Sequence, residues 1–258
     1  MLRCGLLQHG RTLLLPAAAR RRLAIAVSSA WPVHLLGSAA LRVECTPCGG
    51  DALVAEKAAL AATLEAFRAE HGFGRGIAAP QIGVTRRFVA LNLGSSQPVS
   101  SPADPAAAAG GGGGSAPALG TRVLSDPRIV WRSGETMTLW DDCMSLPWLL
   151  CKVRRHRSIS VQFTNERNEP ELWEQLPEAT SELLQHELDH LDGVLITDRM
   201  LECGSGALGS GAAVAADPMV QTMVSREEYE ANREEFDRQV DSTIVPTIPP
   251  VYSRLSPA

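Results

Sequence analysis

The chain has 258 residues, 45% of them apolar, and a net charge of −5. This length and composition predict a globular protein of one large domain or two small ones, with enough apolar residues for a sizeable core. The negative charge argues against a general nucleic-acid binder, and no apolar run is long enough to span a membrane. Six cysteines in a chain of this length do not indicate a disulfide framework.

The first 43 residues contain six arginines and no Asp or Glu. Such a composition is typical of an organelle transit peptide, and the arginines at 20–22 interrupt the compact apolar run that a secretory signal needs. We therefore expect residues 1–40 to lie outside the fold and to direct the protein to the mitochondrion, with the plastid as the alternative. The simpler interpretation is a basic, disordered tail that carries no targeting signal.

Residues 51–71 have the periodicity of an amphipathic helix, because their apolar residues recur on one face. Asp51 is the candidate N-cap, and Gly72 is the candidate stop. We expect this helix to be purely structural.

The next segment, residues 74–83, reads Gly-Arg-Gly-Ile-Ala-Ala-Pro-Gln-Ile-Gly. Two glycines two positions apart allow a ligand to approach the backbone closely, and Gln81 adds a side-chain amide. The third glycine and the following helix of a dinucleotide-binding fingerprint are absent. The segment is therefore either a Gly-rich turn before a strand or part of a ligand site.

Four later segments have the patterns of β-strands. They cover residues 87–93, 121–131, 135–140 and 158–163. Residues 95–120 and 204–216 have low complexity and cannot bury enough apolar surface to fold, so we expect two flexible inserts.

Residues 177–192 predict a helix that carries His-Glu-x-x-His. His186 and His190 are four residues apart, so they lie one turn apart on one helix face and can bind the same metal ion. Glu187 then stands where it can act on water at that metal. The alternative is a solvated, charged helix face with two histidines that bind nothing.

A capping-box pattern at Ser225 and Glu228 predicts a last helix that ends near residue 240. Its thin apolar stripe is enough to dock it on a neighbouring element. Residues 243–258 are a Pro-rich tail.

The third ligand of a catalytic metal, which usually has three protein ligands, is not evident from this helix alone. The extended metalloprotease pattern fails at its last histidine, where Ile196 stands. Two candidates remain, a glutamate from the acidic cluster at 227–235 and the thiolate of Cys143. A lone cysteine is more often a small buried hydrophobe, so the residue pattern leaves this choice open.

Three motifs in order resemble those of the peptide deformylases. They are residues 74–81, Cys143-Met144-Ser145 and His186-Glu187-Leu188-Asp189-His190. The resemblance covers roughly residues 40–200, and it implies an α+β fold with antiparallel sheets around a central metal-binding helix. We expect this domain to span residues 41–242.

The resemblance also implies the metal and its ligands. Cys143, His186 and His190 would bind one divalent ion, ferrous iron in the cell, with zinc, nickel or cobalt as substitutes. Glu187 would take a proton from water and deliver one to the leaving amine.

The implied substrate is formyl-methionine at the N-terminus of newly made organellar polypeptides. The Gln81 side chain and the Met144 backbone N–H would stabilise the developing oxyanion, and Gly76 would let the peptide backbone approach. The expected partners are nascent peptides near the ribosome, without direct contact to nucleic acid or membrane. The oligomeric state is left open.

The chain departs from the family pattern at three positions. Asp141 and Asp142 replace the usual Glu-Gly before the cysteine, and Arg75 replaces an aliphatic residue that lines the methionine pocket. Leu183 is expected near that pocket, next to Glu182. We expect an ion pair between Arg75 and Asp141 and a weaker demand for methionine.

Two other functions remain open. One is a metal-binding relative of the deformylases without activity or with altered specificity. The other is a metalloprotease that uses His186, Glu187 and His190 without Cys143.

Overall fold

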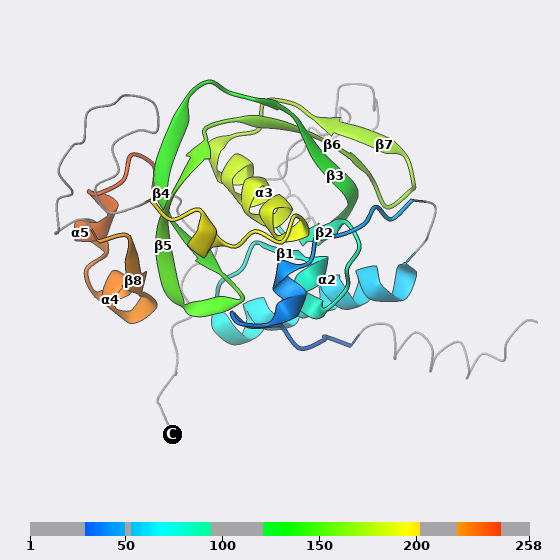
Figure 1. The fold of residues 1–258 in the computed structure, drawn as a ribbon, viewed down its shortest axis with the longest axis horizontal. Helices are drawn as coiled ribbons and strands as arrows, with labels where there is room; N and C mark the ends of the chain where they lie inside the picture. The colour runs from blue at the N-terminus through cyan, green and yellow to red at the C-terminus, as the bar shows by residue number, and fades with distance from the viewer. Residues whose placement is uncertain (1–28, 50–52, 94–120, 202–220, 244–258) are drawn as a thin grey trace, which may run out of the picture.

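The computed structural model describes residues 29–49, 53–93, 121–201 and 221–243 (Figure 1). The two expected inserts, the Pro-rich tail, the candidate cap Asp51 and most of the expected transit segment lie outside these ranges. Among the described helices, none combines the length and the apolar character needed to cross a membrane.

Among the described elements, six strands, β2 to β7, follow one another along the chain, and helices precede and follow this run. The strands are β1 (Gly76–Ala78), β2 (Phe88–Leu91), β3 (Arg122–Arg132), β4 (Thr136–Cys143), β5 (Leu146–His156), β6 (Ile159–Thr164), β7 (Pro170–Trp173) and β8 (Met223–Ser225). The helices are η1 (Ala39–Arg42), α2 (Val54–His71), η2 (Ala79–Ile82), α3 (Glu178–Leu191), η5 (Ile196–Asp198), α4 (Arg226–Ala231) and α5 (Arg233–Asp237).

Two antiparallel sheets surround one central helix. The first sheet has the order β1-β2-β3-β6-β7, and the second has the order β4-β5-β8. Figure 1 shows α3 at the centre, with β3 and β6 on one side of it and β4 and β5 on another, while α2 packs outside β1 and β2. The expected α+β architecture is confirmed.

Helix α3 is buried on nearly all sides. Leu184, Leu188 and Leu191 belong to the core cluster that also contains apolar residues of β2, β3 and β6, as their helical spacing predicts. The opposite face carries polar side chains that are also buried, among them His186 and His190. Buried polar groups of this kind require partners or a ligand, so this face marks a site.

Strand β5 is the longest strand that the sequence did not predict, and the short strands β1, β7 and β8 were not predicted either. Strand β5 pairs with β4 from Thr136↔His156 to Asp142↔Leu150 and then with β8. Its sequence lacks a clean alternation of polar and apolar residues, because Arg155 is buried although it is charged. A charged residue on the buried face hides the period of two that identifies a strand.

The predicted C-terminal helix is two short helices, α4 and α5, with a break at Asn232 (φ −127°, ψ 31°). Its apolar stripe docks as expected, since Phe236 packs edge-on against Trp140 of β4 at 5.4 Å between ring centroids. The indole N–H of Trp140 also donates to the Phe236 carbonyl at 3.0 Å. These contacts hold the C-terminal helices against the second sheet.

A candidate metal centre

Helix α3 and the end of β4 bring three ligand-type side chains together. The ligand atoms of Cys143, His186 and His190 all lie within 4.8 Å of one another, and all three residues are buried. In the described part of the chain this is the one cluster with metal-ligand geometry. The acidic cluster at 227–235, which was the other candidate source of a third ligand, lies on α4 and α5 and is not part of it.

Two hydrogen-bond donors and a histidine ring nitrogen lie close to the sulfur of Cys143. The Ser145 backbone N–H donates to Sγ at 3.4 Å, the Gln81 side-chain amide lies 3.8 Å away, and His190 Nε2 lies 3.2 Å away. Such donors stabilise negative charge on sulfur, which is the form that binds metals.

Asp141 and Arg155 hold His186 in a fixed orientation. His186 Nδ1 lies 3.0 Å from both carboxylate oxygens of Asp141, so this nitrogen carries the proton and Nε2 is left as the acceptor. Arg155 donates to Asp141 at 3.1 Å and also pairs with Asp189 of α3. Burial alone would raise the pKa of Asp141, but His186 and Arg155 lower it to about 2.

Glu187 lies on the same face of α3 and is 3% exposed. Burial raises the pKa of this carboxyl to about 7, a value suited to taking up and releasing a proton near neutrality. Its Oε2 has no hydrogen-bond partner among the described residues. Gly76 of β1 lies against it, because a Cβ added at Gly76 would be 2.6 Å from Oε1.

Gln81 reaches the site from η2, the turn that follows β1. Its Oε1 accepts from the Ala78 backbone N–H at 2.8 Å, and its Nε2 donates to Ser145 Oγ at 3.1 Å. These bonds fix the amide plane beside Cys143. Met144 is buried next to Cys143, and its thioether belongs to the core cluster of α2, β1 and β2.

Arg75 does not pair with Asp141, so the expected ion pair between them is wrong. Arg75 instead forms an ion pair with the buried Glu182 and donates to the Ala179 carbonyl at 2.8 Å. Glu182 lies one turn before His186 on α3 and is nearer to Arg75, while the Asp141 carboxylate is already occupied by His186 and Arg155. Leu183, the other expected pocket residue, lies in the main core cluster.

Asp142, which replaces the usual glycine, has ordinary strand backbone, because it is not among the residues with positive φ. Its carboxylate pairs with Arg226 of α4 at 2.8 Å, and the Arg226 guanidinium lies 3.8 Å from the ring centroid of Phe73. The substitution is therefore accommodated without backbone strain and ties α4 to the edge of the site.

Sequence reasoning missed Arg155 and Ser145, which position His186 and Gln81. Arg155 stands in a run of basic residues that reads as solvated surface, and only its 4% exposure and two carboxylate partners reveal its role.

The cluster fits a divalent metal ion. One thiolate and two imidazoles are a donor set that zinc, iron and related metals accept, and three protein ligands leave positions open for substrate. The Asp141–His186 contact is the outer-shell arrangement that metal-binding histidines usually have.

Known proteins share this chain's sequence pattern and fold. The family model for polypeptide deformylase matches residues 31–205. A peptide deformylase of Thermotoga neapolitana is 30% identical over 130 residues, which are 50% of this chain and 64% of the relative. Peptide deformylase 1 of Prochlorococcus marinus is 29% identical over 164 residues, 64% of this chain and 77% of the relative. The chain thus spans less than two thirds of the first relative's length.

Solved structures agree with this match. The crystal structure of peptide deformylase from Thermotoga maritima superposes with a TM-score of 0.53 at 25% identity, and the match covers 67% of this chain and 98% of that one. The Met-Ala-Ser-bound class I type b peptide deformylase from Acinetobacter baumannii gives 0.50 at 25% identity, with 67% and 99% covered. Since the family model matches more than half of the 258 residues, the chain belongs to the polypeptide deformylase family.

Proposed function

We propose that this protein removes the formyl group from formyl-methionine at the N-terminus of newly made polypeptides. The observation that carries the proposal is the meeting of Cys143, His186 and His190 beside Glu187, a buried carboxylate without a partner for Oε2. A relative of the same fold has been solved with Met-Ala-Ser bound, a peptide that begins with methionine, as the product of deformylation would.

A divalent metal held by Cys143, His186 and His190 would polarise the formyl carbonyl and lower the pKa of water. Glu187 accepts a proton from the attacking water and donates it to the amine nitrogen as the C–N bond breaks, which releases formate and a free amino terminus. The Gln81 amide, with the Met144 backbone N–H, donates to the oxygen on which negative charge develops. Asp141 keeps His186 in the tautomer that leaves Nε2 free.

Formate release from formyl-Met-Ala tests this proposal. The full chain, loaded anaerobically with ferrous iron, should turn over the peptide, and Glu187→Gln should lower the rate at least about 100-fold while metal binding remains. Metal bound at one ion per chain without turnover would indicate the non-catalytic relative instead.

The metalloprotease alternative predicts that Cys143 is dispensable. Cys143→Ala should abolish tight metal binding in a deformylase and leave it nearly unchanged in a protease that relies on His186 and His190. The contacts of the Cys143 sulfur with Ser145 and His190 favour the first outcome.

We also propose a weaker demand for methionine than in bacterial relatives. The buried ion pair of Arg75 and Glu182 stands beside Gly76 and one turn before His186, which makes this side of the site polar. The ratio of kcat/KM for formyl-Met-Ala and formyl-Gln-Ala should rise in the double variant Arg75→Val with Glu182→Leu. A strong methionine preference in the unmodified protein would contradict the idea.

Two finer proposals concern the metal and the location. Ferrous iron is proposed as the cellular metal, and metal analysis of anaerobically purified protein tests it, with zinc alone as the contrary result. The acid-free, Arg-containing segment 1–43 supports delivery to the mitochondrion, with the plastid as the alternative, where translation supplies formyl-methionine. Imaging of the full chain tagged at its C-terminus, compared with a form lacking residues 1–28, tests this; equal distribution of both forms would contradict it.

A further inference from the structure

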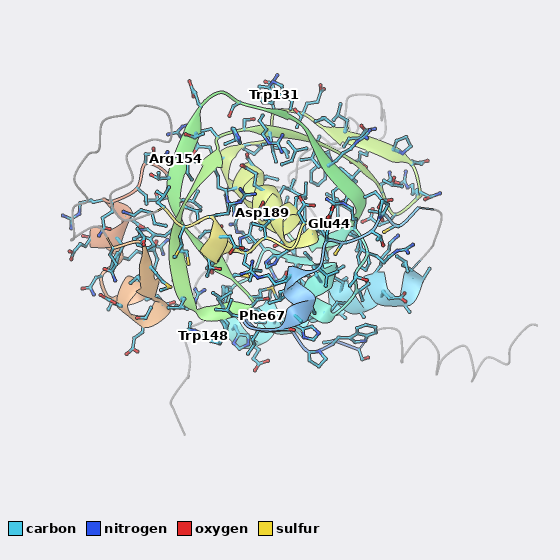
Figure 2. All side chains as sticks on the ribbon, in the orientation of Figure 1. Glu44, Phe67, Trp131, Trp148, Arg154 and Asp189 are labelled. Carbon is cyan, nitrogen blue, oxygen red and sulfur yellow. The ribbon has the colours of Figure 1, made fainter. Side chains whose placement is uncertain are left out.

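A cavity of about 430 Å³ lies along α3, and none of Cys143, His186 and His190 lines it. Helix α3 contributes Gln185, Leu188, Asp189 and Asp192, whose three- and four-residue spacing places them on one face, which does not include His186 or His190. Strands β3 and β5 supply most of the rest of the wall, which is completed by Arg87 just before β2 and Arg199 just after η5. Figure 2 shows Asp189 on α3 and Arg154 on the neighbouring strand pair β4–β5.

The wall of this cavity is strongly basic. It contains six arginines and only two acidic residues, Asp189 and Asp192, in a chain whose net charge is −5. The arginines are Arg87, Arg128, Arg132, Arg154, Arg155 and Arg199. Such a concentration of one sign of charge in a concave site focuses the electrostatic potential and attracts anions.

Three of these arginines pair with the two carboxylates. Arg155 and Arg199 both pair with Asp189, the latter at 2.7 Å, and Arg87 pairs with Asp192 at 2.6 Å. No further carboxylate lines the cavity.

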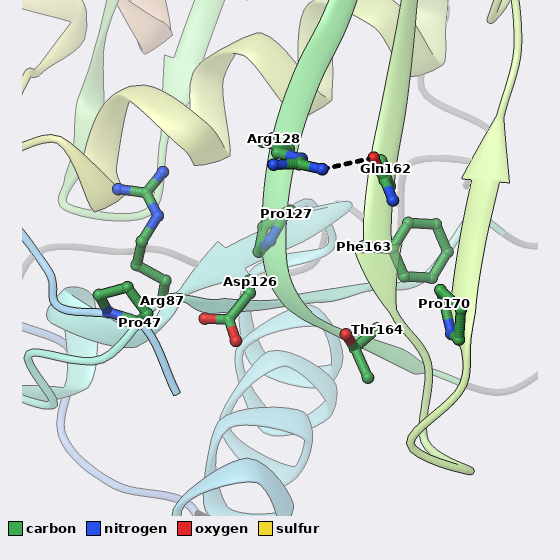
Figure 3. Close-up of a pocket in the computed structure, with 9 residues that line it drawn as sticks. All are labelled: Pro47, Arg87, Asp126, Pro127, Arg128, Gln162, Phe163, Thr164 and Pro170. Carbon is green, nitrogen blue, oxygen red and sulfur yellow. Dashed lines mark hydrogen bonds between the residues drawn. The ribbon is translucent and has the colours of Figure 1, made fainter. Parts of the chain in front are cut away.

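The other three arginines have no acidic partner in the described structure. Arg128 donates only to the neutral amide oxygen of Gln162, at 2.8 Å (Figure 3). The side chains of Arg132 and Arg154 are exposed and have no hydrogen-bond or ion-pair partner among the described residues. Three uncompensated guanidinium groups around one cavity repel one another, and an oxyanion that they share would relieve this repulsion.

The chemistry and the size of the site both favour a small ligand. Guanidinium groups match phosphate oxygens through paired N–H donors. The adjoining hollow in Figure 3 shares Arg87 and Arg128 but is otherwise lined mainly by Pro47, Pro127, Phe163 and Pro170, so the basic surface does not extend in that direction. A confined basic site in an acidic protein suits a compact anion better than a long nucleic acid.

We propose that this cavity binds a small multivalent oxyanion of the phosphate class, held by Arg128, Arg132 and Arg154. The group is either free phosphate or pyrophosphate or the terminal phosphates of a nucleotide. None of these three arginines forms a hydrogen bond or ion pair with a candidate metal ligand in the described structure, although Arg155 of the same wall also holds Asp141 beside His186. The proposal does not depend on deformylase activity.

Calorimetric titration of the metal-loaded full chain tests the proposal, at constant ionic strength. Inorganic phosphate, pyrophosphate and ADP are the probes, and their relative affinities distinguish a free anion from a nucleotide. Arg132→Gln and Arg154→Gln should each raise the Kd about tenfold, because each removes a charge-assisted hydrogen bond. Because both side chains are exposed, the melting temperatures of the two variants should match that of the unmodified protein.

Arg167→Gln is the matched control. Arg167 is also exposed and has no side-chain partner among the described residues, but it lies in the β6–β7 turn away from the cavity. The substitution Arg167→Gln removes the same charge as the two test variants and should leave the Kd for each probe unchanged. The proposal is overturned if no probe binds, or if all variants bind equally well, as they would if the probe bound the metal.

Discussion

Gly76 and Glu187 are the pair of residues in the site whose fit is tightest. A methyl group at position 76 would lie 2.6 Å from Glu187 Oε1, which is closer than Cβ atoms come to other atoms in real structures, and 3.0 Å from its Cδ. Because Glu187 is enclosed, it cannot move aside without losing its place beside His186. Glu187, the proposed proton acceptor, can therefore keep its position only if residue 76 has no side chain.

Gly76→Ala should therefore lower kcat for formate release, by about 100-fold if the carboxylate moves by an ångström. Gly134→Ala is the control, since a Cβ at Gly134 meets no atom within 4 Å and its φ is not positive. Steady-state kinetics of both variants check the prediction, and equal rates would contradict it.

Asp141 acts on the metal centre through His186. Asp141→Asn removes the charge that orients the imidazole and leaves Arg155 with Asp189 as its remaining carboxylate partner. We expect zinc affinity, measured by competition with a chelating dye, to fall about 10- to 100-fold. Asp142→Asn, the neighbouring change, alters only the pair with Arg226 and should keep the affinity within about twofold; equal losses in both variants would refute this role.

At the scale of elements, β3 and β7 are linked by one carboxylate across the first sheet. Glu171 of β7 accepts hydrogen bonds from Arg122 of β3 at 3.1 Å and from the indole N–H of Trp173 at 2.8 Å. Burial would raise the pKa of Glu171, but these donors lower it overall. A folded-state pKa below the unfolded value means that the contribution to stability is present above the unfolded pKa and is lost as the pH falls through the folded pKa.

Glu171→Gln should thus lower the free energy of unfolding at pH 7 by about 1–2 kcal/mol. The variant should also lose less stability than the unmodified protein between about pH 5 and pH 3, where the carboxylate takes up its proton. Urea unfolding at several pH values checks this. Glu174→Gln, an exposed glutamate just after β7 with no side-chain partner among the described residues, should behave like the unmodified protein.

At the scale of the whole molecule, the metal ligands come from different parts of the fold. Cys143 ends β4 in the second sheet, whereas His186 and His190 belong to α3, which packs on the first sheet. A bound ion would therefore join the helix to the second sheet in the folded state, and the unfolded chain has no comparable site.

Removal of the metal should lower the melting temperature. At free metal 100-fold above its Kd, the lost stabilisation is about 2.7 kcal/mol. Calorimetric scans with and without a chelator measure the difference in melting temperature. The Cys143→Ala variant should show no such difference, because it no longer binds the ion tightly. An unchanged melting temperature in the metal-loaded and metal-free protein would show that the cluster does not bind metal in solution.

The sequence alone determined the features that depend on local spacing. His186, Glu187 and His190 share a helix face because one turn separates positions four apart, whatever surrounds the helix. The strands β2, β3, β4 and β6 and the helix α2 were likewise recognisable, since burial imposes periods of two and of about 3.6 on their apolar residues.

Only the tertiary structure decided which distant groups meet. Residue spacing left Cys143 and the acidic cluster at 227–235 as rival third ligands, and the packing of β4 against α3 selected Cys143. The same packing pairs Arg75 with Glu182 instead of Asp141, and it buries Arg155 between the carboxylates of Asp141 and Asp189. The physical reason is that an ion pair or a ligand set depends on distances of a few ångströms between side chains far apart in the chain, and those distances exist only once the sheets have closed around the helix.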